Sequence, residues 1–135
     1  MQFHHDQPAT TLAILGADTV VGRALCALLE ESGYRTAPID SYPTGIVDDL
    51  LGGADLLLIA PRLDEAARGA FLGSMGKSAP QRADMPVIAL TTTLEEGFPE
   101  KEGVIRVPWP CETKALVERI EAALARERPN GALAV

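Results

Sequence analysis

The most constraining feature of the sequence is an uninterrupted apolar segment near its middle. Residues 56–59 read Leu-Leu-Leu-Ile, between Asp55 and Ala60. A strand with one wet face alternates apolar and polar residues, whereas a strand covered on both faces is apolar throughout. The segment from Asp55 to Ala60 is therefore predicted to be the central strand of a parallel sheet with helices on both faces.

Four other segments have the composition of strands and are bounded by turn-forming residues. They are Thr11–Leu15, Tyr34–Ile39, Pro86–Thr91 and Val104–Val107. Because these strands alternate with amphipathic segments and no hairpin turn joins them, they are expected to run parallel, with right-handed crossovers. The predicted fold is α/β, a three-layer αβα sandwich around a five-stranded parallel sheet.

Helices are predicted from the spacing of apolar residues and from capping residues at the helix starts. The first follows Asp18 or Thr19, either of which could cap it, and a short second helix spans 44–51. The last is expected from Glu112 to Arg126. The third begins after Asp64, ends before a loop over 76–84, and has an inner face formed by Ala67, Ala70, Phe71 and Met75.

The length of 135 residues suits one domain. We expect a flexible arm over 1–10, a folded domain over 11–127 and a flexible tail over 128–135. The start of the chain lacks the charge and apolar order of a signal peptide, and no apolar run is long enough to span a bilayer, so a cytoplasmic protein without a membrane partner is expected.

Charge and residue counts exclude several classes of function. A net charge of −7 repels phosphate backbones, so no nucleic-acid partner is expected. The two histidines, His4 and His5, both lie in the N-terminal arm. Because no Ser-His-Asp or Cys-His set and no metal-ligand spacing is available, we predict neither an enzyme nor a metal site.

Several segments resemble the response-regulator receiver domains of two-component signalling. The similarity covers Thr11 to Arg126 and is carried by the order of strands and helices. The clearest local matches are Leu28-Leu29-Glu30-Glu31-Ser32-Gly33-Tyr34, Ala54-Asp55-Leu56-Leu57-Leu58-Ile59, Met85-Pro86-Val87-Ile88-Ala89-Leu90-Thr91, and Trp109-Pro110 with the helix after it. The resemblance implies flavodoxin-like receiver topology with strand order 2-1-3-4-5. The segment between Thr91 and Pro110 is short, which implies a shortened fourth helix.

Receivers hold Mg²⁺ with an acidic pair after the first strand and accept the phosphoryl group on an Asp after the third. The positions that match these carboxylates are Gly16, Ala17 and Ala60, so all three are missing. The family's Lys before a cis-prone Pro matches Trp109 before Pro110. Thr91 matches the switch hydroxyl, and Asp18 matches a third, variable acidic position that could also cap the helix.

The resemblance therefore implies a receiver-like regulatory domain that cannot be phosphorylated and uses no cofactor. It would act by protein–protein interaction in signal transduction, on another signalling protein or on itself as a homodimer. Trp109 is open to two interpretations: an exposed anchor for a partner, or a ring that fills the space left by the missing charged groups.

An alternative comes from the turn between Gly16 and Gly22, which is similar to the glycine-rich turn of short-chain dehydrogenase-like proteins. Such a turn binds a dinucleotide pyrophosphate at a helix start, and Asp40 is placed to hold the ribose. However, Thr19 stands at the middle glycine and no Tyr-x-x-x-Lys pair occurs. The other interpretation is that Gly16 permits a tight turn and Gly22 permits close packing.

Overall fold

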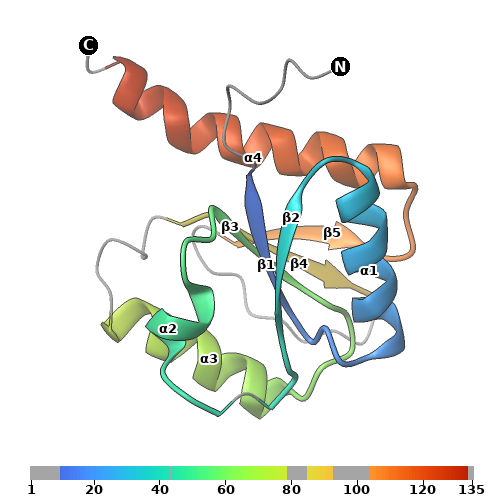
Figure 1. The fold of residues 1–135 in the computed structure, drawn as a ribbon, viewed down its shortest axis with the longest axis vertical. Helices are drawn as coiled ribbons and strands as arrows, with labels where there is room; N and C mark the ends of the chain where they lie inside the picture. Colours follow the sequence, from blue (N-terminus) through green and yellow to red (C-terminus); the bar gives the residue numbers. More distant parts are fainter. Residues whose placement is uncertain (1–9, 43, 79–84, 93–103, 134–135) are drawn as a thin grey trace.

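Five parallel strands form one sheet in the order β2-β1-β3-β4-β5 (Figure 1). The structure, a computed structural model, describes residues 10–42, 44–78, 85–92 and 104–133. The strands are β1 Thr11–Leu15, β2 Arg35–Ile39, β3 Leu56–Ile59, β4 Val87–Thr91 and β5 Val104–Pro108. The predicted sheet and its strand order are confirmed.

Four helices lie in the described part of the chain and cover both faces of this sheet (Figure 1). They are α1 Val20–Glu31, α2 Val47–Leu51, α3 Glu65–Ser78 and α4 Thr113–Leu133. One core cluster joins the sheet to α1 and α4, through residues such as Leu25 and Ile120. A second joins the sheet to α2 and α3, through Leu51 and Phe71. The three-layer sandwich is thus observed.

The central strand has the environment that its sequence predicts. All four residues of β3 are at most 1% exposed. Leu56 and Leu58 belong to the cluster under α1 and α4, whereas Leu57 and Ile59 belong to the cluster under α2 and α3. Alternate residues of one strand therefore enter two separate cores, which is why neither set can be polar.

The carboxyl ends of α3 and α4 differ from the prediction, and so does Ala70, which was expected on the inner face of α3. α3 continues to Ser78, into the stretch expected to be a loop. Ala70 is exposed, because Ala67, Phe71 and Met75 are spaced by four residues and occupy the inner row without it. α4 continues past Arg126 to Leu133, through Pro129, Asn130 and Gly131, which are weak helix formers, so local propensity does not explain this extension.

Other predictions lie outside the described residues. The N-terminal arm with His4 and His5 and the shortened fourth helix of the receiver pattern, expected within 93–103, belong to this group. The domain limits at 11 and 127 remain predictions.

Tyr34 links the start of β2 to α4, and we expect it to make the stability of the protein depend on pH in the alkaline range. Its side chain is largely buried, and its hydroxyl donates a hydrogen bond to the carboxylate of Glu121. Burial, and then the bond to Glu121, raise the pKa of Tyr34 above its ordinary value near 10. The folded protein thus favours neutral Tyr34, and this contribution is present below about pH 10 and lost at higher pH.

Substituting Tyr34→Phe is expected to lower the free energy of unfolding by about 1–2 kcal/mol at neutral pH. The variant should also lose stability less steeply than the wild type above about pH 10. Urea unfolding at pH 7, 9 and 10.5 measures both effects. Tyr42→Phe is the matched control, because Tyr42 is exposed. An equal response of the two variants would contradict the assignment.

Candidate functional site

The predicted pocket residues lie where the strands end, at the carboxyl edge of the sheet. Gly16 and Ala17 follow β1 directly, Ala60 follows β3, Thr91 ends β4, and Trp109-Pro110 follow β5. The Ala60 N–H donates to the Leu15 carbonyl at 3.0 Å, and the Trp109 N–H donates to the Thr91 carbonyl at 2.8 Å. These backbone bonds join neighbouring strand ends into one edge, as the resemblance to receivers requires.

The space between the ends of β1 and β3 is apolar and filled. Ala60 is fully buried, and Ala17 is 8% exposed. A Cβ atom placed on Gly16 would lie 3.0 and 3.1 Å from the two Cδ atoms of Leu63 and 3.1 Å from Ala60 Cβ. Leu63 packs against both core clusters. The immediate surroundings of Gly16 and Ala60 are thus hydrocarbon.

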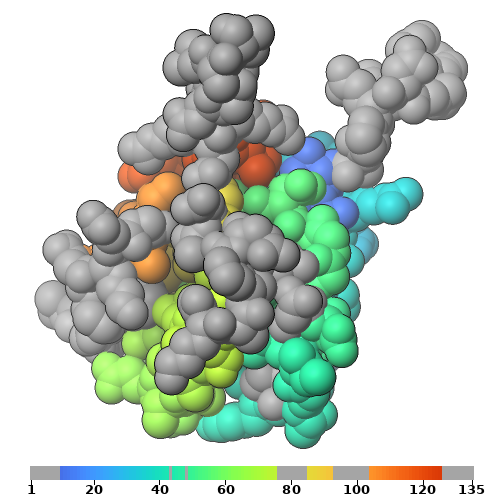
Figure 2. All heavy atoms as spheres, turned by 90° about the vertical axis from the view of Figure 1, so that its left-hand side faces the viewer, coloured from blue at the N-terminus to red at the C-terminus, as the bar shows by residue number. Residues whose placement is uncertain are grey.

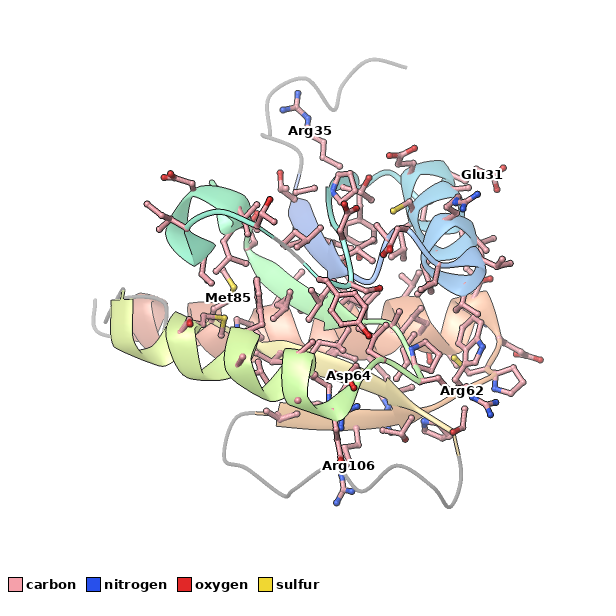
Figure 3. The ribbon with its side chains drawn as sticks, turned by 90° about the horizontal axis from the view of Figure 1, so that it is seen from below. Glu31, Arg35, Arg62, Asp64, Met85 and Arg106 are labelled. Carbon is pink, nitrogen blue, oxygen red and sulfur yellow. The ribbon has the colours of Figure 1, made fainter. Side chains whose placement is uncertain are left out.

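Leu63 is the site residue that sequence reasoning missed. It stands between β3 and α3, where a single leucine has no apolar partner at helix or strand spacing to indicate burial. In the structure it sits between Arg62, whose φ is 64°, and Asp64, whose carboxylate accepts a hydrogen bond from the Ala67 N–H at 3.1 Å. Figure 3 shows Arg62 and Asp64 in this segment after β3. Asp64 caps α3 as predicted, and the turn between the two directs Leu63 inward.

Asp18 does not cap α1, and its carboxylate is bound to Ser41. Its Oδ1 atom accepts hydrogen bonds from the backbone N–H and the hydroxyl of Ser41, both at 2.8 Å. The hydroxyl of Ser41 is the main reason that the pKa of Asp18 is lowered. Thr19 is the cap instead, because its hydroxyl accepts from the Gly22 N–H. No three His, Cys, Asp or Glu side chains in the described ranges are grouped to hold a metal ion.

Four backbone N–H groups of the turn from Gly16 to Gly22 already donate hydrogen bonds within the protein. The N–H groups of Gly16 and Ala17 both donate to the Ile39 carbonyl, at 2.8 and 3.0 Å. The Thr19 N–H donates to the Gly16 carbonyl at 3.0 Å, and the Gly22 N–H donates to Thr19 Oγ1 at 2.9 Å. A pyrophosphate would need such donors free. The geometry therefore supports the packing interpretation of these glycines, and Asp40 lies exposed beyond β2.

Trp109 and the thiols are packing groups in this arrangement. Trp109 is half-buried and packs against the cluster under α1 and α4, and its peptide bond to Pro110 is cis. Cys26 and Cys111 are half-buried, and burial raises the pKa of both thiols. A raised pKa disfavours the thiolate, which is the nucleophilic form of cysteine.

Known proteins resemble this chain in structure. No family model and no curated protein matches it in sequence. The receiver domain of a signal transduction histidine kinase from Syntrophus aciditrophicus superimposes with a TM-score of 0.69 at 20% identity, covering 89% of this chain and 93% of that one. A putative response regulator from Chloroflexus aurantiacus gives 0.65 at 20% identity, covering 87% and 99%.

A third similar structure is the receiver domain of the sensor histidine kinase PA1611 from Pseudomonas aeruginosa, with a TM-score of 0.69 at 17% identity, covering 87% of this chain and 99% of that one. That domain has a magnesium ion coordinated in its active-site cleft. At these identities the likeness establishes the fold, which is the flavodoxin-like fold of receiver domains. No helix in the described part of this chain has the length and apolar character needed to cross a bilayer.

Proposed function

We propose that this chain is a receiver-like regulatory domain that does not accept a phosphoryl group and acts by binding another protein in signal transduction. The observation that carries the proposal is the position of Leu63, which with Ala60 occupies the space above Gly16. A phosphoryl group would need that space, and the cation that accompanies it would need carboxylates there.

Phosphoryl transfer depends on charge that this site does not supply. The phosphoryl oxygens carry developing negative charge, which divalent ions and cationic side chains neutralise in receiver-type chemistry. Gly16, Ala17 and Ala60 offer no oxygen ligand from their side chains, and Trp109 replaces the cation. Thr91 keeps a hydroxyl at the end of β4, but a hydroxyl alone holds neither Mg²⁺ nor a phosphoryl group.

The proposal includes a cytoplasmic location and no enzymatic activity of its own. The partner is another signalling protein or a second copy of the chain. The net charge of −7 makes a nucleic acid an unfavourable partner.

Acetyl phosphate with Mg²⁺ is expected to leave the mass of the protein unchanged, and beryllofluoride with Mg²⁺ is expected to leave its melting temperature unchanged. The reason is that alanine stands at the acceptor position, and that the described residues hold no group of three His, Cys, Asp or Glu side chains suited to a cation. Intact mass spectrometry and a thermal shift assay measure the two outcomes, with a magnesium-binding receiver domain as the positive control. A stoichiometric phosphoaspartate would overturn the proposal.

A further inference from the structure

Three large apolar side chains are left exposed in the described part of the chain, and all three follow the ends of β1 and β2. Val20 is 79% exposed, Tyr42 is 68% exposed and Ile46 is 63% exposed. Val20 begins α1, while Tyr42 and Ile46 lie between β2 and α2. Exposed apolar side chains that lie close together on a surface mark contact sites, whereas single scattered ones do not.

The two segments that carry these residues are fixed to each other and to the core. The Asp18 carboxylate binds the backbone N–H and the hydroxyl of Ser41, which joins the turn after β1 to the segment after β2. The Leu50 N–H donates to the Ile46 carbonyl at 3.0 Å, and Leu51 is 1% exposed in the core. Tyr42 and Ile46 are therefore presented from an anchored segment.

Acidic residues flank Tyr42 and Ile46 along the chain. The sequence holds no Lys, Arg or His between Arg35 and Arg62, whereas it holds aspartates at 40, 48, 49 and 55. Asp40 and Asp49 are exposed, on either side of Tyr42 and Ile46 in the chain. We call Asp40, Tyr42, Ile46 and Asp49 the β2–α2 patch; the teal residues low on the face in Figure 2 belong to this part of the chain. The patch combines exposed apolar area with negative charge.

We infer that the β2–α2 patch docks a basic, amphipathic segment of a partner protein, one that carries Leu, Ile or Phe beside Lys or Arg. Apolar side chains would cover Tyr42 and Ile46, and the cations would lie against Asp40 and Asp49, which favours encounter with this class of partner. Nucleic acids and anionic membranes would meet like charge. Two copies joined through this patch would bring their own aspartates together. The inference rests on the proposed role as a protein-binding domain.

The test uses a synthetic helical peptide of about 18 residues, or five turns, with Leu along one face and Lys along the other. Its labelled form is titrated with the full chain and followed by fluorescence anisotropy. A peptide with Glu in place of Lys and a Lys peptide without Leu are the comparison probes. The Leu and Lys peptide is expected to bind, more weakly as salt rises, and the other two are expected to bind at least about tenfold more weakly.

Matched variants separate the patch from general charge attraction. The double variant Tyr42→Ser with Ile46→Ser, and separately Asp40→Lys, should each weaken binding by about tenfold. Glu118→Lys makes the same charge change as Asp40→Lys on the exposed side of α4, and should weaken binding less than twofold.

An equal loss in Glu118→Lys would overturn the inference, and so would equal binding of the Glu peptide or no binding at all. Concentration-dependent dimers in sedimentation that Ile46→Ser abolishes would instead assign the patch to self-association. These outcomes are independent of the acetyl phosphate result. Lost peptide binding leaves the absence of phosphorylation intact, and a phosphoaspartate would leave the peptide result intact.

Discussion

Replacing Ala60 with aspartate is expected to lower the free energy of unfolding by about 3–5 kcal/mol without creating a phosphorylation site. Ala60 matches the acceptor position of receivers, so Ala60→Asp is the direct attempt to restore one. However, its side chain is fully buried and faces Leu63 and Gly16. A carboxylate there would be desolvated, and the methyl groups of Leu63 and the glycine at position 16 supply neither a cation nor a side-chain hydrogen bond.

The loss of stability in Ala60→Asp should depend on pH, and the direction of this dependence identifies burial of the carboxylate as its cause. Burial raises the pKa of a carboxyl group, so the folded variant would favour the neutral acid. The penalty is then largest at neutral pH, where the unfolded chain is ionised, and shrinks as the pH falls toward the ordinary pKa near 4.

Urea unfolding of Ala60→Asp at pH 7.5 and pH 4.5, each relative to the wild type at the same pH, measures this dependence. Ala60→Asn is the matched control, because its side chain has the same shape and does not ionise. It should lose about 1–3 kcal/mol at both pH values. A fully stable Ala60→Asp protein that acetyl phosphate labels would show that Leu63 leaves room for the receiver chemistry, contrary to the proposed function.

The replacements in the pocket make physical sense as a set. In an acidic pocket several carboxylates repel one another unless a cation lies between them. If one carboxylate were removed, the remaining ones would stay buried but would attract a cation less strongly. Under the proposed function all three matching positions are Gly or Ala and Leu63 packs beside Gly16, so these three positions add no buried side-chain charge in need of a partner.

The features predictable from sequence were those that local rules determine. The run from Leu56 to Ile59 has no alternation, and the structure buries both of its faces. Thr19 and Asp64 have the chemistry of helix caps at helix starts, and both accept the expected hydrogen bonds. Such features depend on spacing and side-chain type within a few residues.

The features that sequence reasoning missed depend on contacts between distant segments. Asp18 was expected to cap a helix or meet a cation, but its partner is Ser41, on the loop after another strand. Leu63 enters the pocket because of the turn at Arg62, whose positive φ no local rule predicts for an arginine. Both depend on how two strand ends come together, and a single sequence does not display that pairing.

Replacing Gly22 with alanine is expected to lower the free energy of unfolding by at least about 3 kcal/mol. A Cβ atom on Gly22 would lie 2.0 Å from the Gly16 carbonyl oxygen and 2.7 Å from Ala17 Cα. These are backbone atoms of the turn after β1, and the Gly16 and Ala17 N–H groups tie that turn to Ile39. The turn therefore cannot move aside without breaking bonds between β1 and β2.

Gly69→Ala is the matched control, because it makes the same change in another helix. Gly69 lies on the exposed side of α3, and a Cβ atom there would meet nothing within 4 Å. Alanine at that position is expected to raise the free energy of unfolding by about 0.5–1 kcal/mol, since it restricts the unfolded chain and favours the helix. Urea unfolding monitored by circular dichroism compares the two variants.

Opposite signs for Gly22→Ala and Gly69→Ala would establish that Gly22 is required for the contact between α1 and the turn after β1. This result would also bear on the dinucleotide alternative, which needs the same glycine for a ligand. If Gly22→Ala kept its stability and abolished a thermal shift that the wild type shows with NADH, the glycine would serve a nucleotide. If stability falls and the wild type shows no shift with NADH, the close approach of two backbone segments is the whole reason for a glycine at position 22.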